Sequence, residues 1–160
     1  SGGKVAFYTG IMPICQDETG VAVVMGHEIA HAIARHGNER VSQSLALQGL
    51  ATGTDLLLLI KEKPEAARDL VNVAYGVGGQ LGMLAYGRKH ESEADEMGLT
   101  FMAMAGYNPS EAPVFWDRMG KLGGQRPPLM LSTHPHPEKR QEDLRKLVPK
   151  AMIIYNQNKK

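Results

Sequence analysis

The sequence has little of several features that would direct it toward particular classes of protein. Cys15 is the only cysteine in 160 residues, so no intrachain disulfide can form and no redox compartment is indicated. Aromatic residues make up 6% of the chain, whereas glycine (18) and methionine (9) are frequent. This favours close helix packing over an aromatic-cored β-sandwich. A formal net charge of +1 gives no electrostatic case for nucleic acid or an anionic membrane.

Long apolar runs are also missing. Residues 71–87 carry no charge, but glycines interrupt them and they fall short of the ~20 residues that a membrane-spanning helix needs. The chain has no initiating Met and no signal peptide, and it begins Ser-Gly-Gly. We therefore expect a single domain over residues 1–160, excised from a longer precursor whose N-terminal segment is missing. A peripheral or lipoprotein anchor on that segment is compatible with this sequence.

The most informative stretch is His27-Glu28-x-x-His31, an H-E-x-x-H pattern of zinc-dependent hydrolases. Residues four apart lie on one face of an α-helix, so both imidazoles can point at one metal ion. Glu28 lies about 100° round the helix, within reach of a water on that metal. Such a zinc lowers the pKa of its water, and Glu28 would take the proton as the water attacks a peptide carbonyl.

The surroundings of this pattern strengthen the metal hypothesis. Most other residues between Val21 and Ala34 are small or apolar, which is typical of a buried helix. Each unpaired polar group buried there would cost on the order of 2–7 kcal/mol, and a metal ion would satisfy His27, Glu28 and His31 together. Two alternatives remain: a surface helix with an incidental histidine pair, and a buried helix in which these three side chains pack without metal.

A catalytic zinc takes three protein ligands, so a third is needed. The later carboxylates and imidazoles supply the candidates: Glu91, Glu93, Asp95, His36, His90, His134 and His136. Glu91 and Asp95 are four apart and can face the His27 helix together, one as a ligand and the other accepting the outer N–H of a ligating imidazole. Glu93 points away from that face, and His36 is expected to be exposed.

The coarse pattern predicts a mainly α fold of the α+β class. Residues 4–8 read as a strand and 11–15 as a second extended piece broken by Pro13, together a short N-terminal β-hairpin with an edge strand. An extended substrate polypeptide could pair with that edge. Helices are expected over residues 17–36, 39–60, 65–86, 88–106, 110–122 and 137–147. The glycine-rich helix at 65–86 should pack closely on the metal helix; a flexible glycine loop is the alternative.

Taken together, the motifs resemble the gluzincin peptidase family of the CAAX prenyl proteases, the heat-shock protease HtpX and the outer-membrane protease BepA. The resemblance covers nearly the whole chain. It rests on residues 26–37 around the metal helix, Glu91-x-x-x-Asp95 some sixty residues later, Gly106-Tyr107-Asn108-Pro109, and the loop at 132–140. That loop is most similar to the soluble BepA-like branch. The implied fold is a zincin-like metallopeptidase helical domain.

The resemblance implies that His27, His31 and Glu91 bind one zinc ion per chain. It implies Glu28 as the catalytic base, and Asp95 as the residue that holds a ligating imidazole in place. The implied activity is hydrolysis of peptide bonds in misfolded or envelope proteins, in the manner of a quality-control protease.

The resemblance also implies roles for two residues of the late loop. His134 can approach the metal, either donating to the reacting carbonyl oxygen or plugging the fourth position, and Arg140 can stabilise the oxyanion. A plugged site defines a rival hypothesis: a latent zinc domain that acts as a protein-binding or chaperone-like module. By resemblance the protein is expected in the periplasm or bacterial envelope, with mitochondria and cytosol as alternatives. The oligomeric state does not follow from the sequence.

Overall fold

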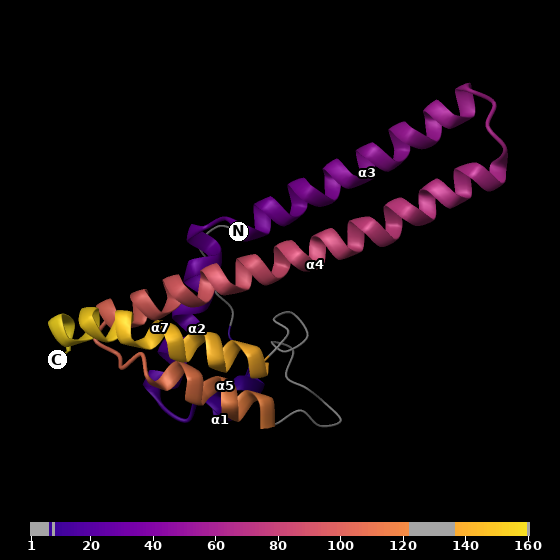
Figure 1. Ribbon diagram of the computed structural model, residues 1–160. Helices are drawn as coiled ribbons and strands as arrows, with labels where there is room; N and C mark the ends of the chain where they lie inside the picture. The colour runs from indigo at the N-terminus through magenta and orange to yellow at the C-terminus, as the bar shows by residue number, and fades with distance from the viewer. Residues whose placement is uncertain (1–6, 8, 122–136, 160) are drawn as a thin grey trace. The chain divides into compact units, whose positions relative to one another are not determined.

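The computed structural model describes residues 7, 9–121 and 137–159, and these are mainly helical (Figure 1). The elements run in the order η1 (Thr9–Ile11), α1 (Met12–Cys15), α2 (Glu18–Ile33), α3 (His36–Ile60), α4 (Glu65–Met104), α5 (Glu111–Lys121) and α7 (Pro137–Asn158). The chain divides into two compact units. Residues 1–34 and 91–160 form the core unit, and residues 35–90 form the hairpin unit.

The beginning of the chain differs from the sequence-based prediction. Residues 11–15 are helical rather than extended, because Pro13 occupies the first turn of α1, where a missing N–H costs nothing. Ile14 and Cys15 are buried in the core. The predicted second strand of the N-terminal hairpin is therefore wrong. The predicted strand at residues 4–8, apart from Phe7, lies outside the described residues, and the described parts of the chain contain no strand.

Helix α2, which carries the H-E-x-x-H pattern, begins as predicted. Asp17 is its N-cap, and Asp17 Oδ1 accepts hydrogen bonds from the backbone N–H groups of Thr19 (2.9 Å) and Gly20 (3.0 Å). These bonds satisfy donors that have no partner inside the helix. The helix ends at Ile33, and Arg35 in the left-handed region (φ 57°) separates it from α3. The predicted end at residue 36 was three residues late.

The hydrophobic core of the core unit forms around α5, which packs against α1, α2 and α7. Its largest fully buried side chains include Trp116, Phe115 and Met119 of α5 and Leu144 of α7. The rings of Phe115 and Trp116 meet edge to face, 5.6 Å between centroids. Each such side chain contributes roughly 1.5–3 kcal/mol by leaving water. Helix α7 continues well beyond the predicted end at residue 147 and includes Pro149.

Burial also determines the chemistry of Cys15, which is 1% exposed. Burial raises the pKa of its thiol, and the opposing charge of Arg118 does not cancel that effect. Thiolate is the reactive form, so we expect iodoacetamide to alkylate Cys15 in the native protein at least about tenfold more slowly than in denaturant. Mass spectrometry of timed samples would measure both rates. Equal rates would show that the thiol is accessible in the native state.

The hairpin unit consists of α3 and the first part of α4, joined by a turn at residues 61–64. Both helices are continuous: α3 runs through Gly49 and Gly53, and the alternative of a flexible glycine loop at residues 65–86 is wrong. The glycine-rich stretch lies against α3, since a Cβ at Gly79 would meet Leu47 there. The close packing on the metal helix that was predicted for this stretch is made later in α4. No helix in the described part of the chain is long and apolar enough to cross a membrane.

Candidate metal centre

Helix α2 places two imidazoles beside each other, one turn apart. The Nε2 atoms of His27 and His31 are 3.0 Å apart, and the two rings meet edge to face. His27 is 2% exposed, whereas His31 is partly exposed. Two imidazole nitrogens turned toward one point from the same helix face confirm the geometry that the i, i+4 spacing predicts.

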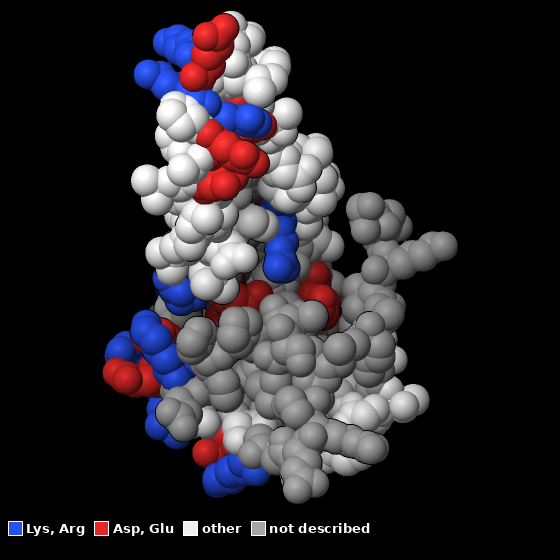
Figure 2. Space-filling model, turned by 90° about the vertical axis from the view of Figure 1, so that its right-hand side faces the viewer, with Lys and Arg blue, Asp and Glu red and all other residues white. Residues whose placement is uncertain are grey.

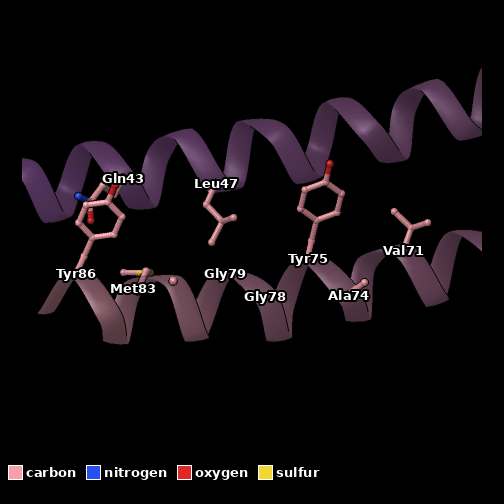
Figure 3. Close-up of a pocket in the computed structure, with 10 residues that line it drawn as sticks. Gln43, Leu47, Val71, Ala74, Tyr75, Gly78, Gly79, Met83 and Tyr86 are labelled. Atoms are coloured by element: carbon pink, nitrogen blue, oxygen red, sulfur yellow. The ribbon is translucent and has the colours of Figure 1, made fainter. Parts of the chain in front are cut away.

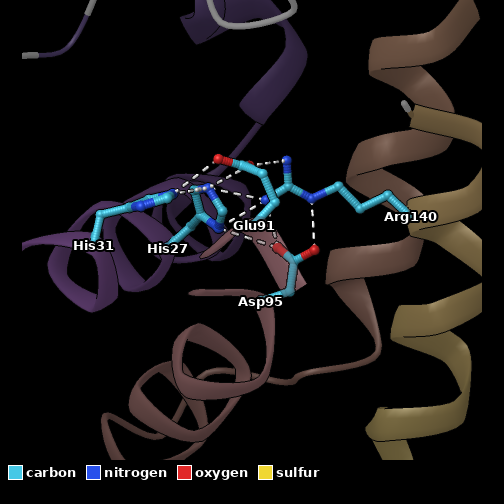
Figure 4. A network of polar contacts seen from close by, with 5 residues as sticks. All are labelled: His27, His31, Glu91, Asp95 and Arg140. Atoms are coloured by element: carbon cyan, nitrogen blue, oxygen red, sulfur yellow. Dashed lines mark hydrogen bonds and ion pairs between the residues drawn. The ribbon is translucent and has the colours of Figure 1, made fainter. Parts of the chain in front are cut away.

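The carboxylate of Glu91, on α4, completes the cluster (Figure 4). Glu91 Oε2 lies 3.4 Å from His27 Nε2, and Glu91 Oε1 lies 3.2 Å from His31 Nε2. Two ligand atoms bound to one tetrahedral zinc at about 2.0–2.1 Å are about 3.3–3.4 Å apart. Among the described residues, His27, His31 and Glu91 are the group of three whose ligand atoms lie within 4.8 Å of one another. The donor set and its spacing therefore fit zinc.

Two glycines allow α2 and α4 to approach closely enough for this cluster to form. A Cβ built on Gly26 would lie 2.6 Å from the backbone oxygen of Gly98, and one on Gly98 would lie 2.9 Å from the backbone nitrogen of His27. Neither contact can be relieved by moving a flexible side chain, because both involve backbone. Gly26 directly precedes His27, so the closest approach of the two helices occurs at the site.

Asp95 lies one turn beyond Glu91 and contacts the other side of the His27 ring. Its Oδ1 is 3.1 Å from His27 Nδ1, the nitrogen that does not face Glu91. A carboxylate at this nitrogen holds the ring orientation and leaves Nε2 as the atom available to a metal. This is the arrangement expected from the four-residue spacing of Glu91 and Asp95.

Arg140, on α7, reaches both carboxylates with its guanidinium group (Figure 4). Its Nε donates to Asp95 Oδ2 at 2.6 Å, its Nη1 donates to Glu91 Oε2 at 2.9 Å, and its Nη2 donates to Asp95 Oδ1. Nη2 also lies 2.8 Å from Nδ1 of His27. Burial alone would raise the pKa of Asp95, but the charge and hydrogen bonds of Arg140, helped by His27, outweigh it. The pKa of Asp95 therefore lies below its ordinary value of 3.8.

Trp116 was not among the residues predicted for the site. Its ring lies under the guanidinium of Arg140, 3.8 Å from ring centroid to Cζ, and edge to face with His27 at 6.3 Å. The aromatic face both attracts the cation and keeps water from it. The only feature of the sequence that marks Trp116 is that it is the single tryptophan of the chain, and this does not indicate a metal site.

The remaining candidates lie elsewhere. His36 is buried and stacks on His90, with 4.2 Å between ring centroids, so the prediction of an exposed His36 is wrong. His90 Nε2 lies 3.0 Å from Glu39 Oε2 within the hairpin unit, and Glu93 is exposed. Glu28 is partly buried on α2. His134 and His136 lie outside the described residues, so their predicted roles stay predictions.

A family model for peptidase family M48 matches residues 1–148. The chain belongs to peptidase family M48. This M48 chain is 36% identical over 157 residues to the mitochondrial metalloendopeptidase OMA1 of Arabidopsis thaliana, covering 97% of this chain and 30% of that protein. It is 37% identical over 163 residues to OMA1 of Saccharomyces cerevisiae, with 98% and 44% covered.

A bacterial M48 relative is the beta-barrel assembly-enhancing protease of Escherichia coli K12. It is 30% identical over 151 residues, which cover 90% of this chain and 30% of that protein. The chain thus spans less than half the length of these curated relatives. No solved structure is significantly similar. The family that the motifs resembled is confirmed, and its members among these relatives divide between mitochondrial and bacterial proteins.

Proposed function

We propose that this chain is the peptidase domain of a zinc-dependent endopeptidase that hydrolyses peptide bonds. The observation that carries the proposal is the meeting of two imidazoles from α2 and one carboxylate from α4 at ligand spacing. Three nitrogen and oxygen donors leave a fourth tetrahedral position for water or substrate, which is typical of catalytic rather than structural zinc. The names of the M48 relatives, a metalloendopeptidase and a protease, support the same reaction class.

In this proposal His27, His31 and Glu91 would hold the zinc, which when bound would lower the pKa of a water molecule and act as a Lewis acid toward the substrate carbonyl. Glu28 accepts the proton of the attacking water and returns it to the leaving nitrogen. Glu28 directly follows His27 on α2, about 100° further round the helix, which supports a base beside the ligands that is not itself one of them. The geometry of His134 is outside the described residues, and its proposed contribution is a hydrogen bond to the developing oxyanion.

We assign Asp95 and Arg140 to positioning. Asp95 fixes the His27 ring through Nδ1, and Arg140 holds the carboxylates of Asp95 and Glu91 through its fork of N–H donors. Arg140 is 5% exposed and its donors are directed at these side chains. This arrangement supports a role in orienting the ligands, alongside the oxyanion role that the resemblance implies.

Exchange of Glu28 for glutamine tests the proposal most directly. Glu28→Gln removes the base and keeps the shape, so we expect cleavage of unfolded casein to fall by about 10²–10⁴-fold. Zinc content, measured by mass spectrometry of the purified protein, should stay at one ion per chain. Glu18→Gln, an exposed substitution on the same helix, serves as the matched control and should cleave like the wild type. A chelator should abolish cleavage, and added zinc should restore it.

The same assay discriminates the rival function. If the wild type binds zinc but neither it nor His134→Ala cleaves casein, the endopeptidase proposal fails and a latent protein-binding module takes its place. If Glu28→Gln cleaves as well as the wild type, the assigned base is wrong. Release of activity by His134→Ala alone would identify His134 as a plug.

Substrate and location are the finer parts of the proposal. We propose misfolded or envelope polypeptides as substrates, with the predicted strand at residues 4–8 aligning an extended segment. The relatives' names support a bacterial or a mitochondrial setting. The periplasmic location expected from the sequence corresponds to the bacterial setting. Attachment through a preceding N-terminal segment remains part of this proposal.

A further inference from the structure

The hairpin unit has almost nothing buried inside it. Among residues 35–90, His36 and His90 are the only buried side chains, and both lie where the two helices leave the hairpin. The helices touch through a few contacts, such as the hydrogen bond from Thr54 Oγ1 to Tyr75 Oη (3.2 Å). Two helices with apolar surface and no shared core are not stabilised by each other alone, and helices that are apolar on most sides are normally covered.

Large apolar side chains lie on the outer side of α4. Leu70, Val73, Val77, Leu81 and Leu84 follow one another at helical spacing and are 55–71% exposed. At 100° per residue they form one stripe. Tyr75 and Gly79, which contact α3, lie on the opposite side of the helix. The stripe therefore points away from α3.

Helix α3 likewise carries an apolar stripe on the side that faces away from its partner helix. Leu45, Leu56 and Ile60 are 55–68% exposed and share one side of the helix. Leu47 and Thr54, which contact α4, lie on the other side. The two apolar stripes thus line opposite outer edges of the hairpin. A globular partner that covers one edge leaves the other in water.

Between the helices runs an apolar groove of about 510 Å³ (Figure 3). It is lined by Ala74, Tyr75, Gly78 and Gly82 of α4 and by Leu47 of α3. A Cβ built on Gly78 or Gly82 would meet nothing within 4 Å. The groove therefore continues the apolar surface across the face between the two edges.

Charge is confined to the two ends of the hairpin. Residues 41–54 and 70–87 carry none, which gives uncharged lengths of about 21 and 27 Å at 1.5 Å per residue. Figure 2 shows Lys, Arg, Asp and Glu gathered toward the closed end, with uncharged side chains below them. Asp55 and Arg68 there neutralise each other through two hydrogen bonds of 3.0 Å. At the open end, Arg35, Arg40, Arg88 and Lys89 flank the uncharged arms, against one acid, Glu39.

We propose that the hairpin unit embeds in the surface of a lipid bilayer that carries anionic headgroups. The uncharged arms lie among acyl chains, which also fill the groove, and the basic open end contacts phosphate groups. Lipid is the occupant that the observations favour, because it surrounds a hairpin on both edges and the groove at once. The net charge of +1 for the whole chain indicates no attraction to an anionic membrane, but the basic residues gathered at this one end of the hairpin are complementary in charge to anionic headgroups. The embedding requires no helix to cross the bilayer.

The full chain should sediment with vesicles of phosphatidylcholine and phosphatidylglycerol, with chelator present so that peptidase activity plays no part. Leu81→Glu should weaken partitioning into vesicles at least about tenfold, since it removes one leucine that the lipid would bury and adds a charge in its place. Leu81 is 62% exposed, so the exchange leaves the fold intact, which circular dichroism checks. Ile153→Glu is the matched control: Ile153 is 63% exposed on α7, in the core unit, and its variant should bind like the wild type.

A tryptophan placed at each position gives a second measurement. Leu81→Trp should shift its emission to the blue and be quenched by bromolipid when vesicles are added, whereas Ile153→Trp should do neither. Binding should be weaker on pure phosphatidylcholine and should fall with added salt. Wild-type protein that stays in the supernatant, or Leu81→Glu that binds undiminished, would overturn the proposal. A dimer that Leu81→Glu dissociates, without vesicle binding, would overturn it in favour of a second copy.

Discussion

Arg140→Ala is expected to lower the free energy of unfolding of the metal-free protein by about 3–5 kcal/mol. The substitution leaves the buried carboxylate of Asp95 and that of Glu91 without their cation, and breaking a buried ion pair from one side costs about this much. For a chain of this length the melting temperature should fall by roughly 10 °C. Urea unfolding followed by circular dichroism measures the difference. Arg145→Ala, an exposed arginine on the same helix, should change stability by less than about 0.5 kcal/mol.

The pH dependence of this loss separates the charge of Arg140 from its packing on Trp116. The folded-state pKa of Asp95 lies below 3.8, so its pairing stabilises the wild type above about pH 4 and is lost as the pH falls through the folded value. In Arg140→Ala the effect of burial dominates and the pKa of Asp95 rises. At low pH the Asp95 carboxylate of the variant becomes protonated, and the cost of burying an unpaired charge disappears. The difference in free energy of unfolding between the wild type and Arg140→Ala should therefore become smaller in acid. A difference that does not change with pH would assign the loss to packing instead.

Gly26→Ala is expected to impair the metal centre through the backbone. The added methyl group would lie 2.6 Å from the oxygen of Gly98, so α2 and α4 must separate where they carry His27 and Glu91. We expect a loss of about 1–3 kcal/mol in stability and about tenfold to a hundredfold in zinc affinity. Competition with a chromogenic chelator measures the affinity, and thermal unfolding measures the stability.

Gly49→Ala provides the matched control for this exchange. A Cβ on Gly49, in the middle of α3, would meet nothing within 4 Å. Alanine is the better helix former there, so the same chemical change should stabilise the protein by up to ~1 kcal/mol and leave zinc binding unchanged. If Gly26→Ala behaved like Gly49→Ala, the close approach at Gly98 would have no part in forming the site.

Features that depend on near neighbours in the chain were predictable from the sequence. The cap at Asp17, the start of α2 and the shared face of His27 and His31 all follow from local hydrogen bonding and from 3.6 residues per turn. The contact of both Glu91 and Asp95 with the His27 ring follows from the same helical spacing. The membership in family M48 followed from these motifs taken in order.

Features that join distant segments were decided only by the tertiary structure. Arg140 and Trp116 meet at His27 because α5 packs on both α2 and α7, and no local pattern records which side chain of a helix will face a neighbour. Gly98 matters only because Gly26 lies against it. His36 stacks on His90, which is 54 residues away in the chain, and is buried there. Helical periodicity alone shows only that His36 lies on a different face from His27 and His31, and it cannot show that another helix covers that face. Helical periodicity specifies which residues share a face, and the packing of whole helices specifies what that face meets.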